Sequence, residues 1–115
     1  MKLKFKIQLL EEASKFLDSL DEKDRDKIIY NIYKSQIIDD KELFKKLVGE
    51  IWEFRTLYNK SKYRLLAFWD KTSKIESIVI ATHGFVKKTD KTPKSDIEKA
   101  ERLRQIYFEQ KKRKK

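Results

Sequence analysis

Two arginines and a glutamate occupy alternating positions in two apolar stretches near the middle of the chain. Glu53 and Arg55 lie in residues 51–58, and Arg64 lies in residues 63–69. Guanidinium groups stay charged and match the geometry of phosphate oxygens, so two arginines on one face suit a phosphodiester. A surface salt bridge between either arginine and Glu53 would leave the same pattern. The residue types therefore indicate either a phosphate-binding face or an ordinary charged surface.

A second group of candidate residues follows the last strongly apolar stretch of the chain. The only histidine, His83, precedes Lys87, Lys88 and Lys91, with Phe85 among them. An aromatic ring interleaved with cations can stack on a base while the cations hold its phosphates. A single histidine at a strand end can equally have a structural role. Phe85 and the three lysines are therefore candidates for binding a nucleic acid together with the two arginines.

Metal and nucleotide chemistry find little support in the composition. The chain has one histidine, no cysteine and no tight group of carboxylates, which argues against a metal-dependent nuclease. A Mg²⁺ site formed by two carboxylates that are distant in the sequence stays open as an alternative. With only Gly49 and Gly84, the chain has no glycine-rich phosphate loop. The sequence therefore predicts a site without a cofactor.

The positive charge is confined to the second half of the chain. Residues 1–50 are balanced in charge, and residues 51–115 carry the whole net charge of +10. The expected partner is a polyanion, with nucleic acid first and an acidic membrane or acidic protein next. Lysines that only keep the surface soluble are the alternative. Because no apolar run approaches the roughly 18 residues of a membrane span, and cysteines and a signal segment are absent, we expect a cytoplasmic protein.

The first half of the chain predicts one strand and two helices. Residues 2–8 alternate as a strand does, and the apolar residues that follow repeat at helical spacing to about Leu20. Asp21 is a suitable N-cap for a second helix. We expect the two helices to form an antiparallel hairpin over a sheet. The buried stripe of the second helix is expected to consist of Ile28, Ile29, Ile32, Tyr33 and Ile37.

The second half predicts three strands and a closing helix. Residues 51–58, 63–69 and 75–82 have the composition of strands, and short turns join them into a meander. Pro93 fits the first position of the helix that follows. The predicted order is β-α-α-β-β-β-α. This is an α+β fold in which helices pack against one small, antiparallel-dominated sheet.

The turn between the first two strands of the meander decides which side chains share a face. Pairing Tyr58 with Tyr63 would place Arg55 and Arg64 on the same face, at diagonal positions roughly 7–8 Å apart. Glu53 would join them there, and the aromatic residues of both strands would lie on the other face, under the helices. We therefore expect the glutamate and both arginines on the open face of the sheet.

Four segments carry a resemblance to a known family. They are Trp52-Glu-Phe-Arg55, Tyr63-Arg-Leu-Leu66, the block from His83 to Pro93, and Glu98 to Arg102. Together they closely resemble the HigB-like toxins, phage-associated members of the RelE/ParE toxin superfamily. The resemblance implies a RelE-like fold and a toxin of a type II toxin–antitoxin pair that cleaves messenger RNA on translating ribosomes. It also implies contact with ribosomal RNA and a HigA-like antitoxin with a helix-turn-helix DNA-binding domain.

The resemblance also implies roles for individual residues. The basic residues of the RelE-like sheet would stabilise charge on the phosphorus while the 2′-OH attacks without a metal. A carboxyl group, the histidine or a lysine of lowered pKa would supply the acid or the base. The chain lacks the paired catalytic histidine and acid of some relatives, so the base stays unassigned. The catalytic candidates are Glu53, Arg55, Arg64, His83, Lys87 and Lys88.

Two other functions stay open. A ParE-like toxin of the same fold binds DNA gyrase without any cleavage, and an inactive prophage remnant would bind RNA without cutting it. We expect residues 1–110 to form one RelE-like toxin domain and residues 111–115 to form a basic tail. That tail would either follow the backbone of ribosomal RNA or only add solubility.

Overall fold

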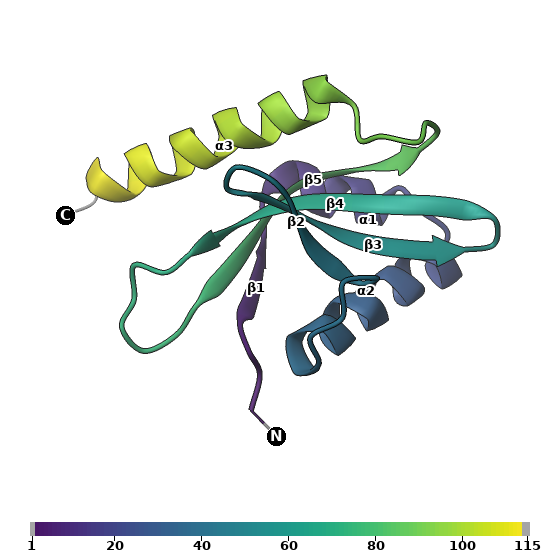
Figure 1. Cartoon of the computed structure of the whole chain (residues 1–115), viewed down its shortest axis with the longest axis horizontal. Helices are drawn as coiled ribbons and strands as arrows, with labels where there is room; N and C mark the ends of the chain where they lie inside the picture. Colours follow the sequence, from purple (N-terminus) through teal and green to yellow (C-terminus); the bar gives the residue numbers. More distant parts are fainter. Residues whose placement is uncertain (1, 114–115) are drawn as a thin grey trace.

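The computed structural model describes residues 2–113, which form one sheet flanked by helices (Figure 1). The predicted α+β fold is confirmed. One strand, β2, was missing from the predicted order, because a short edge strand that contains two lysines lacks a clear apolar alternation. The elements are β1 (Lys6–Leu9), α1 (Glu11–Asp18), α2 (Glu22–Ile37), β2 (Phe44–Val48), β3 (Ile51–Tyr58), β4 (Ser61–Asp70), β5 (Ile78–Lys87) and α3 (Lys94–Arg113).

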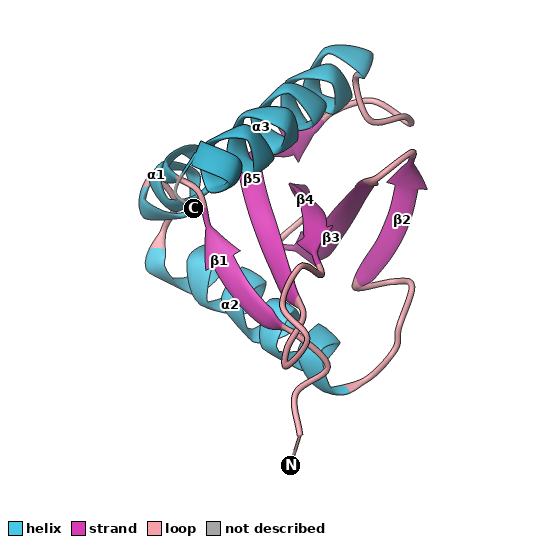
Figure 2. Ribbon diagram, turned by 90° about the vertical axis from the view of Figure 1, so that its left-hand side faces the viewer, coloured by secondary structure: helices cyan, strands magenta, loops and turns pink. Residues whose placement is uncertain are grey.

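The strands follow one another across the sheet in the order β1-β5-β4-β3-β2. The first strand pairs in parallel with the last, and every other pair is antiparallel. The sheet is therefore antiparallel-dominated, as predicted. Figure 2 shows β1 and β2 at its two edges, with α2 and α3 on opposite sides of the strands.

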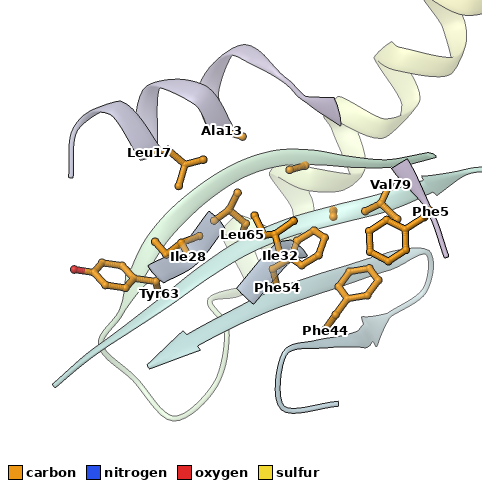
Figure 3. Close-up of a cluster of buried hydrophobic side chains, with 12 residues drawn as sticks. Phe5, Ala13, Leu17, Ile28, Ile32, Phe44, Phe54, Tyr63, Leu65 and Val79 are labelled. Atoms are coloured by element: carbon orange, nitrogen blue, oxygen red, sulfur yellow. The ribbon is translucent and has the colours of Figure 1, made fainter. Parts of the chain in front are cut away.

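The helices α1 and α2 cover one face of the sheet. Their buried residues, among them Leu17 and Ile28, pack on Phe54, Tyr63 and Leu65 of the strands (Figure 3). The aromatic face of the predicted hairpin is thus under the helices, as expected. Tyr63 also donates a hydrogen bond from its hydroxyl group to the carboxylate of Asp24, which ties β4 to α2.

The predicted buried stripe of α2 is only partly right. Ile28 and Ile32 are buried, but Ile29 and Tyr33 are about half exposed. The helix is rotated so that polar residues face the sheet, and Asn31 donates a hydrogen bond to Thr56 of β3. A stripe chosen by hydrophobicity alone misses this rotation, because a buried amide is indistinguishable in sequence from an exposed one.

The helix α3 covers part of the other face. Ala100 packs on Leu66 and Phe68 of β4, and Tyr107 packs on the same cluster. At the far end of α3, Tyr107 and Lys111 both donate hydrogen bonds to the buried carboxylate of Asp70. Burial alone would raise the pKa of Asp70, but these donors and Thr72 hold it below its usual range. The face expected to be open is therefore partly covered by α3.

The β3–β4 hairpin turns more tightly than predicted. Tyr58 pairs with Ser61 instead of Tyr63, and the two turn residues, Asn59 and Lys60, both have positive φ angles of 51° and 66°. Such a two-residue turn matches the twist of the paired strands. The register is shifted by two residues along the strand, so every side chain keeps the face that was predicted for it.

Two boundaries also differ from the prediction. The last strand runs from Ile78 to Lys87, so Ile75 is an exposed loop residue and His83 lies within the strand. Residues 111–113 of the predicted tail form the last turn of α3, and residues 114–115 lie outside the described residues. Among residues 2–113, no helix is long and apolar enough to cross a bilayer.

Candidate RNA-binding site

The three residues singled out on β3 and β4 form one cluster. Arg55 lies directly opposite Arg64 in the hairpin, instead of at the predicted diagonal. The Nε atom of Arg55 is 3.8 Å from Glu53 Oε2, and that of Arg64 is 3.5 Å from Glu53 Oε1. A single buried carboxyl group therefore lies between two guanidinium groups, and the exposed Glu42 approaches Arg55 from outside at 3.8 Å.

Neither arginine is fully satisfied by this arrangement. The Nε atoms of Arg55 and Arg64 are buried and have no hydrogen-bond partner among the described residues. Arg64 donates one hydrogen bond, from Nη1 to the carbonyl oxygen of Tyr63 at 3.0 Å. Since a buried donor without an acceptor costs free energy, an anion that reached these groups would be bound favourably.

A pocket of about 320 Å³ opens beside the cluster. Its walls come from β2, β3, the end of β5, the segment 88–93 and the start of α3. We call it the site pocket, and it is lined by Lys45, Leu47, Val48, Glu53, Arg55, Lys87, Asp90, Lys91, Thr92 and Ile97.

The predicted open position of the cluster is wrong for two of its three members. Glu53 is 2% exposed and Arg64 is 4% exposed, whereas Arg55 is only partly buried. The segment before α3 closes over the glutamate, and Thr92 donates a hydrogen bond to Glu53 Oε1 at 3.2 Å. Burial of Arg64 lowers the pKa of its guanidinium group, and this effect outweighs the attraction of Glu53, which raises the pKa. Arg55 is thus the arginine that reaches the pocket, with Arg64 beneath it.

Lys87 is the candidate lysine whose environment lowers its pKa. It is the last residue of β5 and lines the site pocket. Burial lowers the pKa of Lys87, and the positive charges of Arg64, Arg55 and Lys62 lower it further against the opposing effect of Glu53. A lysine of lowered pKa at position 87 was one of the acids or bases considered from the sequence, and the direction of the shift agrees with it.

The other two candidate lysines lie on the segment 88–93. Lys88 and Lys91 are exposed, and only Lys91 lines the site pocket. Phe85 lies opposite Arg64 on the β4–β5 pair, but its ring packs on the cluster beneath α3. The ring is therefore partly engaged in the core and is less available for stacking than the sequence predicts.

His83 is buried between β5 and α3. Its Nε2 atom is 3.1 Å from Asp96 Oδ1 and its Nδ1 atom is 3.0 Å from Thr82 Oγ1. Burial lowers the pKa of His83, and Lys99 adds to this effect, against the hydrogen bond with Asp96 that raises it. The contact between His83 and Asp96 was not foreseen from the sequence. Both ring nitrogens are occupied and His83 is not among the residues that line the site pocket.

Three residues of this region were missed by the sequence reading. Lys45 of β2 lies opposite Glu53 in the β2–β3 strand pair and lines the site pocket. Thr92 forms a hydrogen bond with Glu53, and Asp96 forms one with His83. Lys45 could have been found only by recognising β2 as a strand. Within residues 2–113, no three His, Cys, Asp or Glu side chains come together as a metal site would require.

Comparison with known proteins places this arrangement in a family. No curated protein matches the chain. The family model described as Phage derived protein Gp49-like (DUF891) matches residues 15–105, which include β3, β4, β5 and most of α3. The matched region contains the arginine cluster and the site pocket together with the helices that hold them. The chain therefore belongs to the phage-derived Gp49-like family, one of the RelE/HigB-like toxin families.

Proposed function

We propose that this chain is the toxin of a type II toxin–antitoxin pair and that it cleaves messenger RNA on the ribosome. The observation that carries the proposal is the cluster of Arg55 and Arg64 around Glu53, with unpaired guanidinium donors beside a lysine-lined pocket. A site that only bound a protein surface would not require buried guanidinium N–H groups that lack a hydrogen-bond partner. Membership of a toxin family gives independent support.

The reaction that suits these residues is attack of a ribose 2′-oxygen on the adjacent phosphorus. The 2′-O–P bond forms and the P–O5′ bond breaks, which leaves a 2′,3′-cyclic phosphate and a 5′-hydroxyl group. One proton leaves the 2′-OH and one is delivered to the departing 5′-oxygen. The phosphoryl oxygens gain negative charge on the way, and cations fixed beside them stabilise that charge without a metal.

We assign these tasks to different side chains of the site pocket. Arg55 and Lys91 hold the phosphate, and the lowered pKa of Lys87 makes its ammonium group a suitable acid for the 5′-oxygen. The arginine Nε atoms are 3.5 and 3.8 Å from the Glu53 oxygens, longer than a hydrogen bond. A guanidinium group that turns to the phosphate frees Glu53 to accept the 2′-OH proton.

Arg64 and His83 act through their neighbours in this proposal. Arg64 lies beneath Glu53 and holds its carboxyl group in place. His83 connects β5 to Asp96 at the start of α3, next to the segment that contributes Thr92 and Lys91 to the pocket. Both are therefore positioning residues. The protein partner is an antitoxin with a helix-turn-helix domain, and the basic second half of the chain also contacts ribosomal RNA.

Primer extension on a translated message tests this function. Wild-type protein should create discrete new 5′ ends inside the coding region. Arg55→Ala should remove them while the protein stays folded, because Arg55 is partly exposed at the pocket wall. Arg25→Ala is the matched control, since this partly exposed arginine on α2 lies outside the pocket, in the charge-balanced half of the chain, and should leave cleavage unchanged. An intact message with wild-type protein would contradict the proposal, and inhibition of gyrase supercoiling would then identify the ParE-like alternative.

A further inference from the structure

A second basic pocket adjoins the site pocket at the tip of the β3–β4 hairpin. It has a volume of about 300 Å³ and is bounded by the hairpin turn and the end of β5. Lys87 and Asp90 line both pockets, so the two are neighbours. We call it the hairpin pocket, and it is lined by Lys60, Ser61, Lys62, Val86, Lys87, Lys88, Thr89 and Asp90.

The strand register sets the spacing between two rows of side chains that contribute to the lining of the two pockets. Arg55, Arg64 and Phe85 form one row across β3, β4 and β5, and Leu57, Lys62 and Lys87 form the next row on the same face. The rows are two residues apart, which is roughly 7 Å along a strand. This separation is comparable with the distance between successive phosphates of an extended single strand.

The hairpin pocket has a strong excess of positive charge. Lys60, Lys62 and Lys88 are exposed, and the ion pairs formed among residues 2–113 involve other cations. Asp90 contributes the one carboxyl group of the pocket lining, against four lysines. Lys62 also adds to the positive charge that lowers the pKa of Lys87. An anion bound here would relieve the repulsion among these cations.

We propose that the hairpin pocket binds the phosphate of the RNA strand next to the one that is cleaved, through Lys60 and Lys62. Exposed Leu57, which lies in the same row as Lys62 and Lys87 and two residues from Arg55 on β3, provides an apolar surface for the base between these phosphates. The hairpin tip then sets the direction in which the strand crosses the site pocket. This inference rests on the proposed function, because a protein that does not bind RNA has no phosphate to place there.

The test uses ribosomes programmed with a short message that contains the cleavage site. Wild type is compared with the double variant Lys60→Gln, Lys62→Gln and with the control Lys23→Gln, Lys34→Gln, which removes two exposed lysines from α2 on the opposite side of the sheet. The hairpin variant should require about five- to tenfold more protein for half-maximal cleavage, since two exposed charge contacts are lost. The control variant should match wild type, as should Lys60→Arg, Lys62→Arg.

A second comparison identifies the phosphate itself. Two messages each carry one neutral methylphosphonate linkage, on the 5′ or the 3′ side of the cleaved linkage. With one of these messages, the amount of wild-type protein needed for half-maximal cleavage should rise to that of the hairpin variant on the unmodified message. On the same modified message the hairpin variant should need no more protein than before, because both changes remove the same contact.

The outcomes separate the inference from the function beneath it. If wild type cleaves and the hairpin variant behaves like the control, the hairpin pocket does not bind the message. If the losses from the variant and from both neutral linkages add, the lysines contact another part of the ribosome and the inference is wrong. If wild type leaves the message intact, the proposed function itself fails.

Discussion

Arg55 and Arg64 face each other directly across the β3–β4 hairpin, and both approach the carboxyl group of Glu53. Like charges placed opposite each other destabilise a strand pair unless a counter-charge lies between them. Here that counter-charge is only 2% exposed, and its two oxygens are divided between the two arginines. The cluster therefore combines a structural role for Glu53 with an unsatisfied capacity to bind an anion.

Glu53→Gln should destabilise the fold by about 1–3 kcal/mol, because it leaves Arg64 buried without a counter-charge. Urea denaturation measures this change. Glu42→Gln is the matched control, since Glu42 also pairs with Arg55 at 3.8 Å but its side chain is 86% exposed. The control should change stability by less than about 0.5 kcal/mol. Equal effects of the two substitutions would show that the buried carboxyl group is not what holds the cluster.

Lys87→Arg should lower the cleavage rate about 10²-fold or more, because arginine keeps the charge but cannot release a proton near neutral pH. Wild-type cleavage should fall as pH rises through the lowered pKa of Lys87, where the acid form is lost. Single-turnover rates across a pH series would show this limb in wild type and its absence in the variant. Lys88→Arg, which alters an exposed neighbour, should keep both the rate and the limb. A Lys87→Arg variant with a wild-type profile would exclude Lys87 as the acid.

His83 should make the stability of the fold sensitive to mild acid. Its pKa is lowered in the folded state, so the unfolded chain takes up a proton more readily as pH falls through the usual value of about 6.5. The free energy of unfolding should therefore be highest above this pH and decrease as pH falls below it. His83→Gln should flatten this part of the curve, measured by urea denaturation at each pH. Parallel curves for the two proteins would mean that the folded state accepts the proton without penalty.

Gly84 should be required by the close approach of α1 to β5. A Cβ atom at this position would overlap the ring of Phe16, well inside van der Waals contact. Gly84→Ala should therefore cost about 1–3 kcal/mol of stability. In a Phe16→Ala background the same substitution should be nearly neutral, because the overlap is gone. If the losses of stability from the two substitutions add in the double variant, the backbone of β5, and not the ring of Phe16, is what requires glycine.

The sequence predicted which face of the sheet each site residue occupies, but it did not predict how deeply these residues are buried. The alternation of side chains placed Glu53, Arg55 and Arg64 on one face. This prediction held although the predicted register was wrong, because the error in register was an even number of residues. Burial of Glu53 and His83 was not predictable, since it depends on how α3 and the segment 88–93 close over the sheet. Local patterns carry no information about that long-range packing.

The boundaries of the strands explain the remaining differences. β5 was expected to end before His83 because the apolar run stops there, but pairing with β4 continues to Lys87. This extension is what brings Lys87 into the row of Lys62 and beside the arginines. The polar end of a strand is held by its neighbour's backbone, so side-chain composition alone does not reveal it.

The chemistry of the RNA ends tests the central claim most directly. Fragments of a ribosome-bound message would be isolated after exposure to wild-type protein, and their termini would be identified by mass spectrometry. Attack by the 2′-oxygen predicts a 2′,3′-cyclic phosphate on one fragment and a 5′-hydroxyl group on the other, with neither formed by Arg55→Ala. Fragments with a 3′-hydroxyl group and a 5′-phosphate, or no fragments, would contradict the account.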